Sequence, residues 1–153
     1  MADVEIRQGT ILASITIMAP PERVFRALTE PDQLLKWWGS DALYRSTSWK
    51  VDLRPGGKWR SEGKRADGSP YWVEGTFVAV DPPHRLAYTW NHSWPTDREG
   101  APETLVTWVL VPVGAGTLVT LTHSGFVPSS EDVRNHGAGW DRVLGWMKAH
   151  AES

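Results

Sequence analysis

Histidine is the side chain that exchanges protons most readily near neutral pH, and three of the five histidines in this sequence are predicted to meet. His92 ends one predicted strand, His123 lies near the end of another, and His136 lies near the start of the last predicted helix. In an up-and-down antiparallel sheet, these strand ends and this helix start lie along one edge. The sequence therefore predicts a polar mouth formed by His92, His123 and His136 above an aromatic interior.

Two roles are open for these histidines. In the first, His92 and His123 are catalytic residues that act as general acid and base. In the second, they are hydrogen-bonded side chains that fix the neighbouring loop and the start of the helix. The second role is favoured, because no acidic residue lies at a diagnostic spacing and because polar groups in pockets usually only orient a ligand.

The same histidines do not predict a metal site. His92 and His123 would lie two strands apart, or roughly 10 Å between backbones at about 4.8 Å per strand, so both would have to lean inward to share an ion. The chain also lacks phosphate-binding, dinucleotide-binding, nucleophile-elbow and zinc-protease motifs. We therefore expect neither a metal nor a cofactor.

Tryptophan is the second unusual feature, because it occurs ten times beside three Phe and three Tyr. A buried indole N–H needs a hydrogen-bond partner, which makes tryptophan awkward as plain core filler, whereas residues around a cavity can bond to ligand or water. A packed core and an aromatic-lined cavity both remain open. From the positions of the aromatic residues and histidines, the predicted ligand-binding residues are Trp59, Tyr88, Trp90, Trp108, His123, His136 and Trp140.

Three further features are explained most simply by packing or by solvation. Trp37 and Trp38 are expected to pack the short helices onto the sheet, although one of them could gate a cavity entrance. Gly137 is expected to allow close backbone packing, in preference to leaving space for a ligand. A solvated sheet face is predicted for four basic residues, namely Lys58, Arg60, Lys64 and Arg65.

The elements that must position these residues follow from the hydrophobic pattern. Residues 4–18 alternate as a strand, and prolines at 21 and 31 open two short helices. Six more strands are predicted from residue 47 onward, the last four over residues 71–80, 85–92, 104–111 and 117–124. A long helix follows from about residue 131, and the only long loop covers residues 93–102.

Composition limits the class of protein. A chain of 153 residues indicates one domain, 1–153, and the absence of cysteine excludes disulfides and thiolate metal sites. A net charge of −2 argues against nucleic-acid binding, and the longest apolar stretch, residues 105–113, is too short to insert into a membrane. No signal peptide is visible, so we expect a cytoplasmic protein. A homodimer and an unknown protein partner both stay open.

Several segments in this order resemble one superfamily. They are APPERVFRALTEPDQLLKWWG (19–39), VDLRPGGKWR (51–60), DGSPYWVEGTFVAVDPPHRLAYTW (67–90), GTLVTLTHSGF (116–126) and HGAGWDRVLGWM (136–147). Together they are similar to the START-like (SRPBCC, or Bet v-like) superfamily, in the branch of the heat-shock-protein-90 ATPase activator homologues. The resemblance implies an α+β helix-grip fold: a seven-stranded curved antiparallel sheet wrapped around a long C-terminal helix, with two short helices after the first strand.

The resemblance also implies a range of functions. The first expectation is a small soluble domain that binds a hydrophobic or aromatic small molecule in an aromatic-lined cavity under the C-terminal helix. One alternative is an enzyme of the cyclase or aromatase kind, in which His92 or His123 moves protons and Tyr88 is a further donor. Another is a co-chaperone-like domain that binds a protein partner. The fold alone does not choose among these functions.

Overall fold

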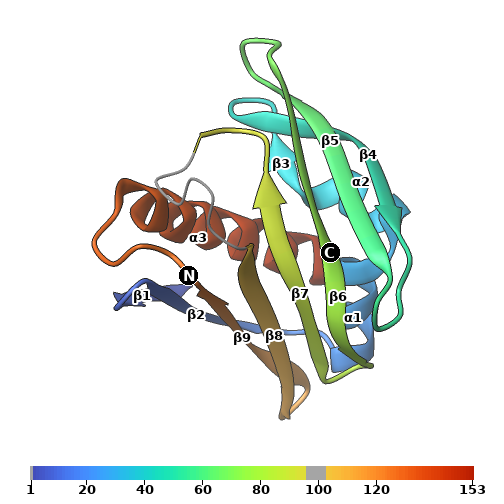
Figure 1. The fold of residues 1–153 in the computed structure, drawn as a ribbon. Helices are drawn as coiled ribbons and strands as arrows, with labels where there is room; N and C mark the ends of the chain where they lie inside the picture. Colours follow the sequence, from blue (N-terminus) through green and yellow to red (C-terminus); the bar gives the residue numbers. More distant parts are fainter. Residues whose placement is uncertain (1, 96–102) are drawn as a thin grey trace.

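A computed structural model describes residues 2–95 and 103–153 and shows one antiparallel sheet with three helices. The nine strands lie in the order β1-β2-β9-β8-β7-β6-β5-β4-β3, and Figure 1 shows how they curve around the last helix. The strands are β1 (Asp3–Arg7), β2 (Thr10–Ile17), β3 (Gly39–Ser40), β4 (Tyr44–Val51), β5 (Lys58–Arg65), β6 (Pro70–Asp81), β7 (Arg85–His92), β8 (Thr104–Val113) and β9 (Gly116–Ser124). The architecture is the α+β helix-grip arrangement that the family resemblance implies.

The first predicted strand, over residues 4–18, is two strands, and this part of the prediction was wrong. The chain turns back at Gln8 and Gly9, which have φ angles of 51° and 77°. Gly9 is required there, because a Cβ atom would lie 2.2 Å from the carbonyl oxygen of Phe126. The resulting strand β1 pairs with β2 at the edge of the sheet, and the two-residue strand β3 extends the opposite edge. The sheet therefore has nine strands where seven were predicted.

Two short helices, α1 (Pro21–Thr29) and α2 (Pro31–Trp37), close one end of the curved sheet. Each begins with a proline at its first turn, where the missing N–H is not needed. The Trp37 indole N–H donates to the carbonyl oxygen of Ala27 at 2.8 Å and so ties the two helices together. Helices this short are stable only through such tertiary packing.

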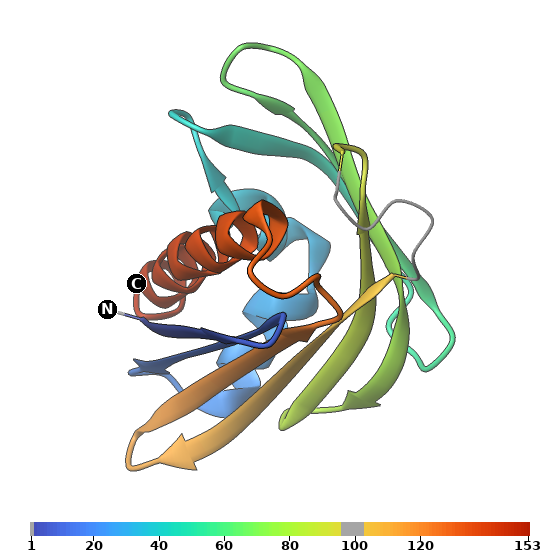
Figure 2. The same ribbon diagram turned by 60° about the vertical axis from the view of Figure 1, so that its left-hand side comes forward.

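The long helix α3 (Glu131–Ala151) crosses the concave side of the sheet, as Figure 2 shows. Ser130 caps it by accepting a hydrogen bond from the Val133 N–H at 3.1 Å. At its other end, the Arg23 guanidinium on α1 donates to the carbonyl oxygen of Ala151 at 2.8 Å. Both ends of α3 are therefore held by hydrogen bonds to neighbouring residues.

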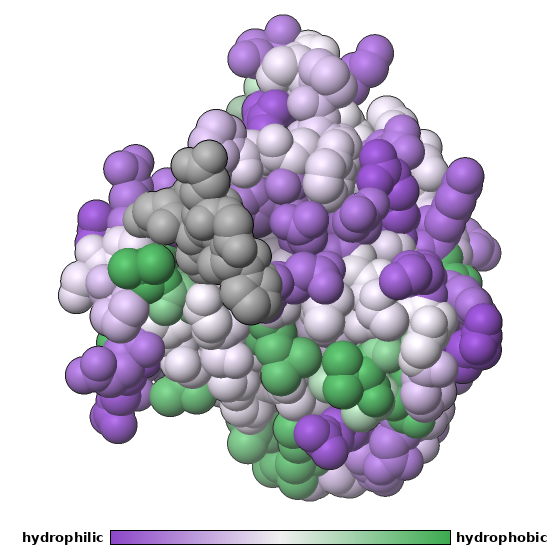
Figure 3. All heavy atoms as spheres, viewed as in Figure 1, coloured by the Kyte–Doolittle hydropathy of each residue, from purple (hydrophilic) through white to green (hydrophobic). Residues whose placement is uncertain are grey.

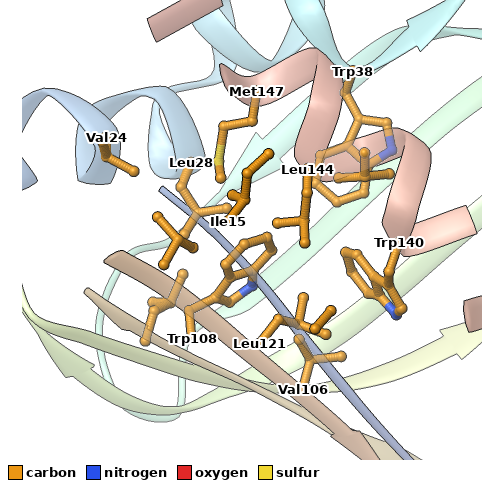
Figure 4. Close-up of a cluster of buried hydrophobic side chains, with 14 of the residues drawn as sticks. Ile15, Val24, Leu28, Trp38, Val106, Trp108, Leu121, Trp140, Leu144 and Met147 are labelled. Atoms are coloured by element: carbon orange, nitrogen blue, oxygen red, sulfur yellow. The ribbon is translucent and has the colours of Figure 1, made fainter. Parts of the chain in front are cut away.

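The tightest part of the core lies where the C-terminal half of α3 meets α1 and the strands β2, β8 and β9 (Figure 4). Its side chains are fully buried, and burying a Leu or Met side chain contributes about 1.5–3 kcal/mol. They include Trp108, Leu121, Leu144 and Met147. Side chains leave a cavity under the N-terminal half of α3, and this cavity is the candidate site.

Candidate functional site

A cavity of about 490 Å³ lies between the N-terminal half of α3 and the strands β4, β5 and β6. Six residues of α3 form one side of it, and residues of the sheet and of the segment after α2 form the other. Exposed lining residues, among them Leu43 and Arg142, mark where the cavity meets solvent. The described lining residues are Trp38, Leu43, Tyr44, Ser46, Trp49, Ser61, Arg65, Tyr71, Val73, Trp90, Trp94, Asn135, His136, Gly139, Trp140, Arg142 and Val143.

Aromatic rings in contact with one another form the apolar wall of this cavity. Trp38 lies 5.2 Å from Trp49 and 5.9 Å from Trp140, measured between ring centroids. Trp140 continues the contact to Trp90 at 5.5 Å. Offset and edge-to-face pairs at these distances are favourable, so the wall holds its shape without a ligand.

Around the same cavity gather buried polar atoms that have no hydrogen-bond partner within residues 2–95 and 103–153. They are Ser46 Oγ, Trp49 Nε1, Ser61 Oγ and the Tyr71 hydroxyl, all on lining residues. The Tyr71 hydroxyl lies near Ser46 Oγ, but no hydrogen bond of normal geometry joins them. An unsatisfied buried polar group costs about 1–3 kcal/mol, so these atoms require water or a ligand as a partner.

Two arginines and two tyrosines set the electrostatics of the cavity. The Arg65 guanidinium lies 5.7 Å from the Tyr71 ring and 5.8 Å from the Trp94 ring. Burial raises the pKa of Tyr44 to about 12, and burial also raises the pKa of Tyr71. Both phenols therefore keep their protons at neutral pH and can donate hydrogen bonds.

The structure brings the three predicted histidines together. The His136 ring lies 5.2 Å from the His92 ring and 5.5 Å from the His123 ring, between centroids. All three are buried, and among them only His136 belongs to the described lining of the cavity. The three side chains thus form a buried cluster behind the cavity wall, with His136 at its inner surface.

Both ring nitrogens of His123 are engaged in one directional chain of hydrogen bonds. The Trp140 indole N–H donates to His123 Nδ1 at 2.9 Å, so Nε2 carries the proton and donates to Thr104 Oγ1 at 2.7 Å. The Thr104 hydroxyl in turn donates to the Trp90 carbonyl oxygen at 3.2 Å. This chain joins β7, β8, β9 and α3, and it favours the structural role over the catalytic one.

His92 and His136 meet a residue that the sequence analysis missed, Asp132. His136 Nδ1 lies 3.0 Å from the Asp132 carbonyl oxygen and 3.1 Å from its carboxylate, and His92 Nε2 lies 3.9 Å from that carboxylate. The ligand atoms of these three residues lie within 4.8 Å of one another, a grouping that could hold a metal ion. The backbone carbonyl makes His136 Nδ1 a hydrogen-bond donor, which favours a hydrogen-bonded cluster. The i,i+4 spacing of Asp132 and His136 was the available signal.

The predicted aromatic residues divide between three places. Trp90 and Trp140 line the large cavity. Trp59 and Tyr88 line a much smaller cavity of about 20 Å³ on the other side of Trp90. Trp108 is fully buried in the core and donates to the Tyr88 hydroxyl at 3.1 Å.

The prediction that Arg65 lies on a solvated face was wrong. Side chains alternate along a strand with a period of two, so Arg65 shares the inner face of β5 with Trp59 and Ser61. It is half-buried and lines the cavity, whereas Lys58 and Lys64 on the other face are exposed.

Trp37 and Trp38 are both buried, although they are adjacent. Trp38 follows the last residue of α2, and its different backbone conformation lets its ring enter the cavity wall. Gly137 faces Ile6 of β1, whose Cδ1 would lie 3.0 Å from an added Cβ atom, which supports the close-packing interpretation.

Comparisons with known proteins agree with this architecture. The family model described as Activator of Hsp90 ATPase homolog 1-like protein matches residues 18–152. Protein CV1439 from Chromobacterium violaceum has a similar structure, with a TM-score of 0.82, 26% sequence identity, and coverage of 96% of this chain and 99% of that chain. No curated protein matches the sequence significantly.

Two further solved structures show the same fold at lower identity. CalU16 from Micromonospora echinospora has a TM-score of 0.69 and 23% identity, over 99% of this chain and 83% of that chain. DynU16, a protein of the dynemicin biosynthetic locus, has a TM-score of 0.76 and 20% identity, over 96% of this chain and 48% of that chain. Within the described residues, no helix has the length and apolar character needed to cross a bilayer.

Proposed function

The chain belongs to the Activator of Hsp90 ATPase homolog 1-like family, and we propose that it binds a hydrophobic or aromatic small molecule in the cavity under α3. One observation carries this proposal: the aromatic-walled cavity retains buried polar atoms that have no hydrogen-bond partner among the described residues. A cavity that served only as a packing defect would be expected to have apolar walls throughout.

The size and lining of the cavity support the proposal. Its volume of about 490 Å³ lies within the range of roughly 300–1,000 Å³ that is typical of small-molecule sites. The wall combines tryptophan rings with a few polar groups, which is the composition such sites share. Ser61 supplies one of these groups, and it is only 1% exposed.

Helix α3 offers a matched pair of variants to test ligand binding. Gly139 lines the cavity, and an added Cβ atom would meet only the end of the Arg142 side chain, at 3.9 Å. Gly145 lies on an exposed part of the same helix, with nothing within 4 Å. Leucine at either position removes a helical glycine, but only Gly139→Leu places a side chain in the cavity.

The probe is N-phenylnaphthylamine, a neutral aromatic compound whose fluorescence rises in apolar surroundings. We expect the natural chain and Gly145→Leu to bind it saturably with equal affinity, and Gly139→Leu to bind it roughly tenfold more weakly or worse. The measurement is a fluorescence titration, with the fold of each variant checked by circular dichroism. Equal affinity of the two leucine variants, or no saturable binding to the natural chain, would contradict the proposal.

A further inference from the structure

We propose that the ligand of this cavity is an acid, an aromatic or apolar molecule with a carboxylate or similar anionic group that Arg65 and Arg142 bind at the edge of the cavity. This inference rests on the proposed function and names the chemical class of its ligand. It follows from the charges, the hydrogen-bond donors and the geometry of the lining residues.

The charge of the lining has one sign. Among the described residues that line the cavity, two are arginines and none is Asp or Glu. Neither Arg65 nor Arg142 pairs with a carboxylate of the described chain. An anionic ligand would supply the missing carboxylate where water is partly excluded and the attraction is stronger than in bulk water.

The hydrogen-bonding groups in the cavity are also biased toward donors. Trp49 offers an unpartnered indole N–H, which can only donate. The phenols of Tyr44 and Tyr71 are protonated at neutral pH, and burial raises the pKa of each still further above its ordinary value, while Arg142 and Arg65 lie near them. A ligand rich in acceptor oxygens satisfies such a set, whereas a cationic ligand would meet two guanidinium groups of like charge.

Arg65 is held in place before any ligand binds. Its Nη1 donates to the Pro70 carbonyl oxygen at 3.0 Å and to Ser69 Oγ at 3.3 Å, and its guanidinium lies near the Tyr71 and Trp94 rings. Within the described residues, its hydrogen bonds use Nη1 alone. Nε and Nη2 therefore remain available for a bidentate contact with an anionic group. Little side-chain entropy is then lost when an anion binds.

A pair of matched probes separates this inference from the proposed function. N-phenylnaphthylamine and anilinonaphthalenesulfonate share one ring skeleton, and only the second carries an anionic group. The affinities of both probes are measured by fluorescence titration for the natural chain, Arg142→Gln, Arg65→Gln and Arg142→Lys. The control is Arg134→Gln, which removes the same charge from an exposed position of α3 that does not line the cavity.

The inference predicts that each cavity glutamine variant binds anilinonaphthalenesulfonate roughly fivefold to tenfold more weakly, while its affinity for the neutral probe changes less than about twofold. Arg142→Lys and Arg134→Gln should keep most of the affinity for the anionic probe. Equal losses for both probes, or no loss for either, would overturn the inference and leave the proposed function standing. Absence of binding by the neutral probe to the natural chain would overturn the proposed function itself.

Discussion

Buried polar side chains of two kinds lie on opposite sides of the first turns of α3. On the core side, His123 is fully buried and has both ring nitrogens in hydrogen bonds. On the cavity side, Ser61 is almost as deeply buried, and its hydroxyl has no hydrogen-bond partner in the described part of the chain. Proteins rarely leave buried polar groups unpaired, so the contrast separates the packed core from the cavity that we propose as the binding site.

Replacement of His123 tests the structural role at the residue scale. His123→Ala would leave the Trp140 indole N–H without its acceptor, would remove the hydrogen bond that the Thr104 hydroxyl accepts, and would open a void between two strands and α3. We expect it to lower the free energy of unfolding by about 2–4 kcal/mol, measured by urea denaturation. Thr122→Ala, on the opposite face of β9, should cost less than about 1 kcal/mol. Similar losses for both variants would contradict the structural role.

The sequence predicts the meeting of His92, His123 and His136, because strand parity and chain order suffice to place strand ends on one edge. It does not predict which aromatic residues line the cavity and which lie in the core. Trp90 and Trp108 both point inward, yet the first lines the cavity and the second is core. That difference depends on the curvature of the sheet and on the position of α3, which no local pattern encodes.

At the scale of elements, α3 has two functions along one buried stripe. Toward the C-terminus this stripe packs Leu144 and Met147 into the core, and nearer the N-terminus it places His136 and Trp140 in the lining of the cavity. The amphipathic pattern predicts the helix and its inward stripe. The pattern does not distinguish residues that pack in the core from residues that line the cavity, because both face the sheet.

The glycines of α3 allow a direct comparison between a packed and a free position. Gly145 has open space around it, so Gly145→Ala should raise the free energy of unfolding by about 0.5–1 kcal/mol through helix propensity alone. An added Cβ atom at Gly137 would lie 3.0 Å from Ile6 Cδ1, so repacking of β1 should offset part or all of the same gain. Urea denaturation of the two variants checks this order. A gain at Gly137 equal to that at Gly145 would show that β1 does not pack closely there.

The positions where strands begin and end could not be predicted from the sequence alone. The split of the first predicted strand depends on Gln8 and Gly9, whose positive φ angles reverse the chain. Strand β4 begins at Tyr44, three residues before the predicted alternation, because its polar first half is held by pairing with β5. In both places pairing with a neighbour, and not local hydrophobic pattern, decides where the strand runs.

At the scale of the whole molecule, two apolar regions are candidates for binding an apolar ligand. One is the cavity under α3, and the other is the outer face of the sheet. Figure 3 shows apolar side chains gathered on the lower part of the view, and exposed apolar residues of β8 include Leu105, Val109 and Val111. In the part of the chain that the structure describes, the cavity combines apolar rings with unpartnered donors and with guanidinium groups that have no carboxylate partner, so we propose that the ligand binds there.

The most direct test is a crystal structure of the protein with anilinonaphthalenesulfonate bound at saturating concentration. The rings should lie against Trp38, Trp90 and Trp140, with the sulfonate within hydrogen-bond distance of Arg65 or Arg142. Density for the probe on the outer face of β8, with the cavity holding only water, would contradict the central claim that this protein binds its ligand beneath α3.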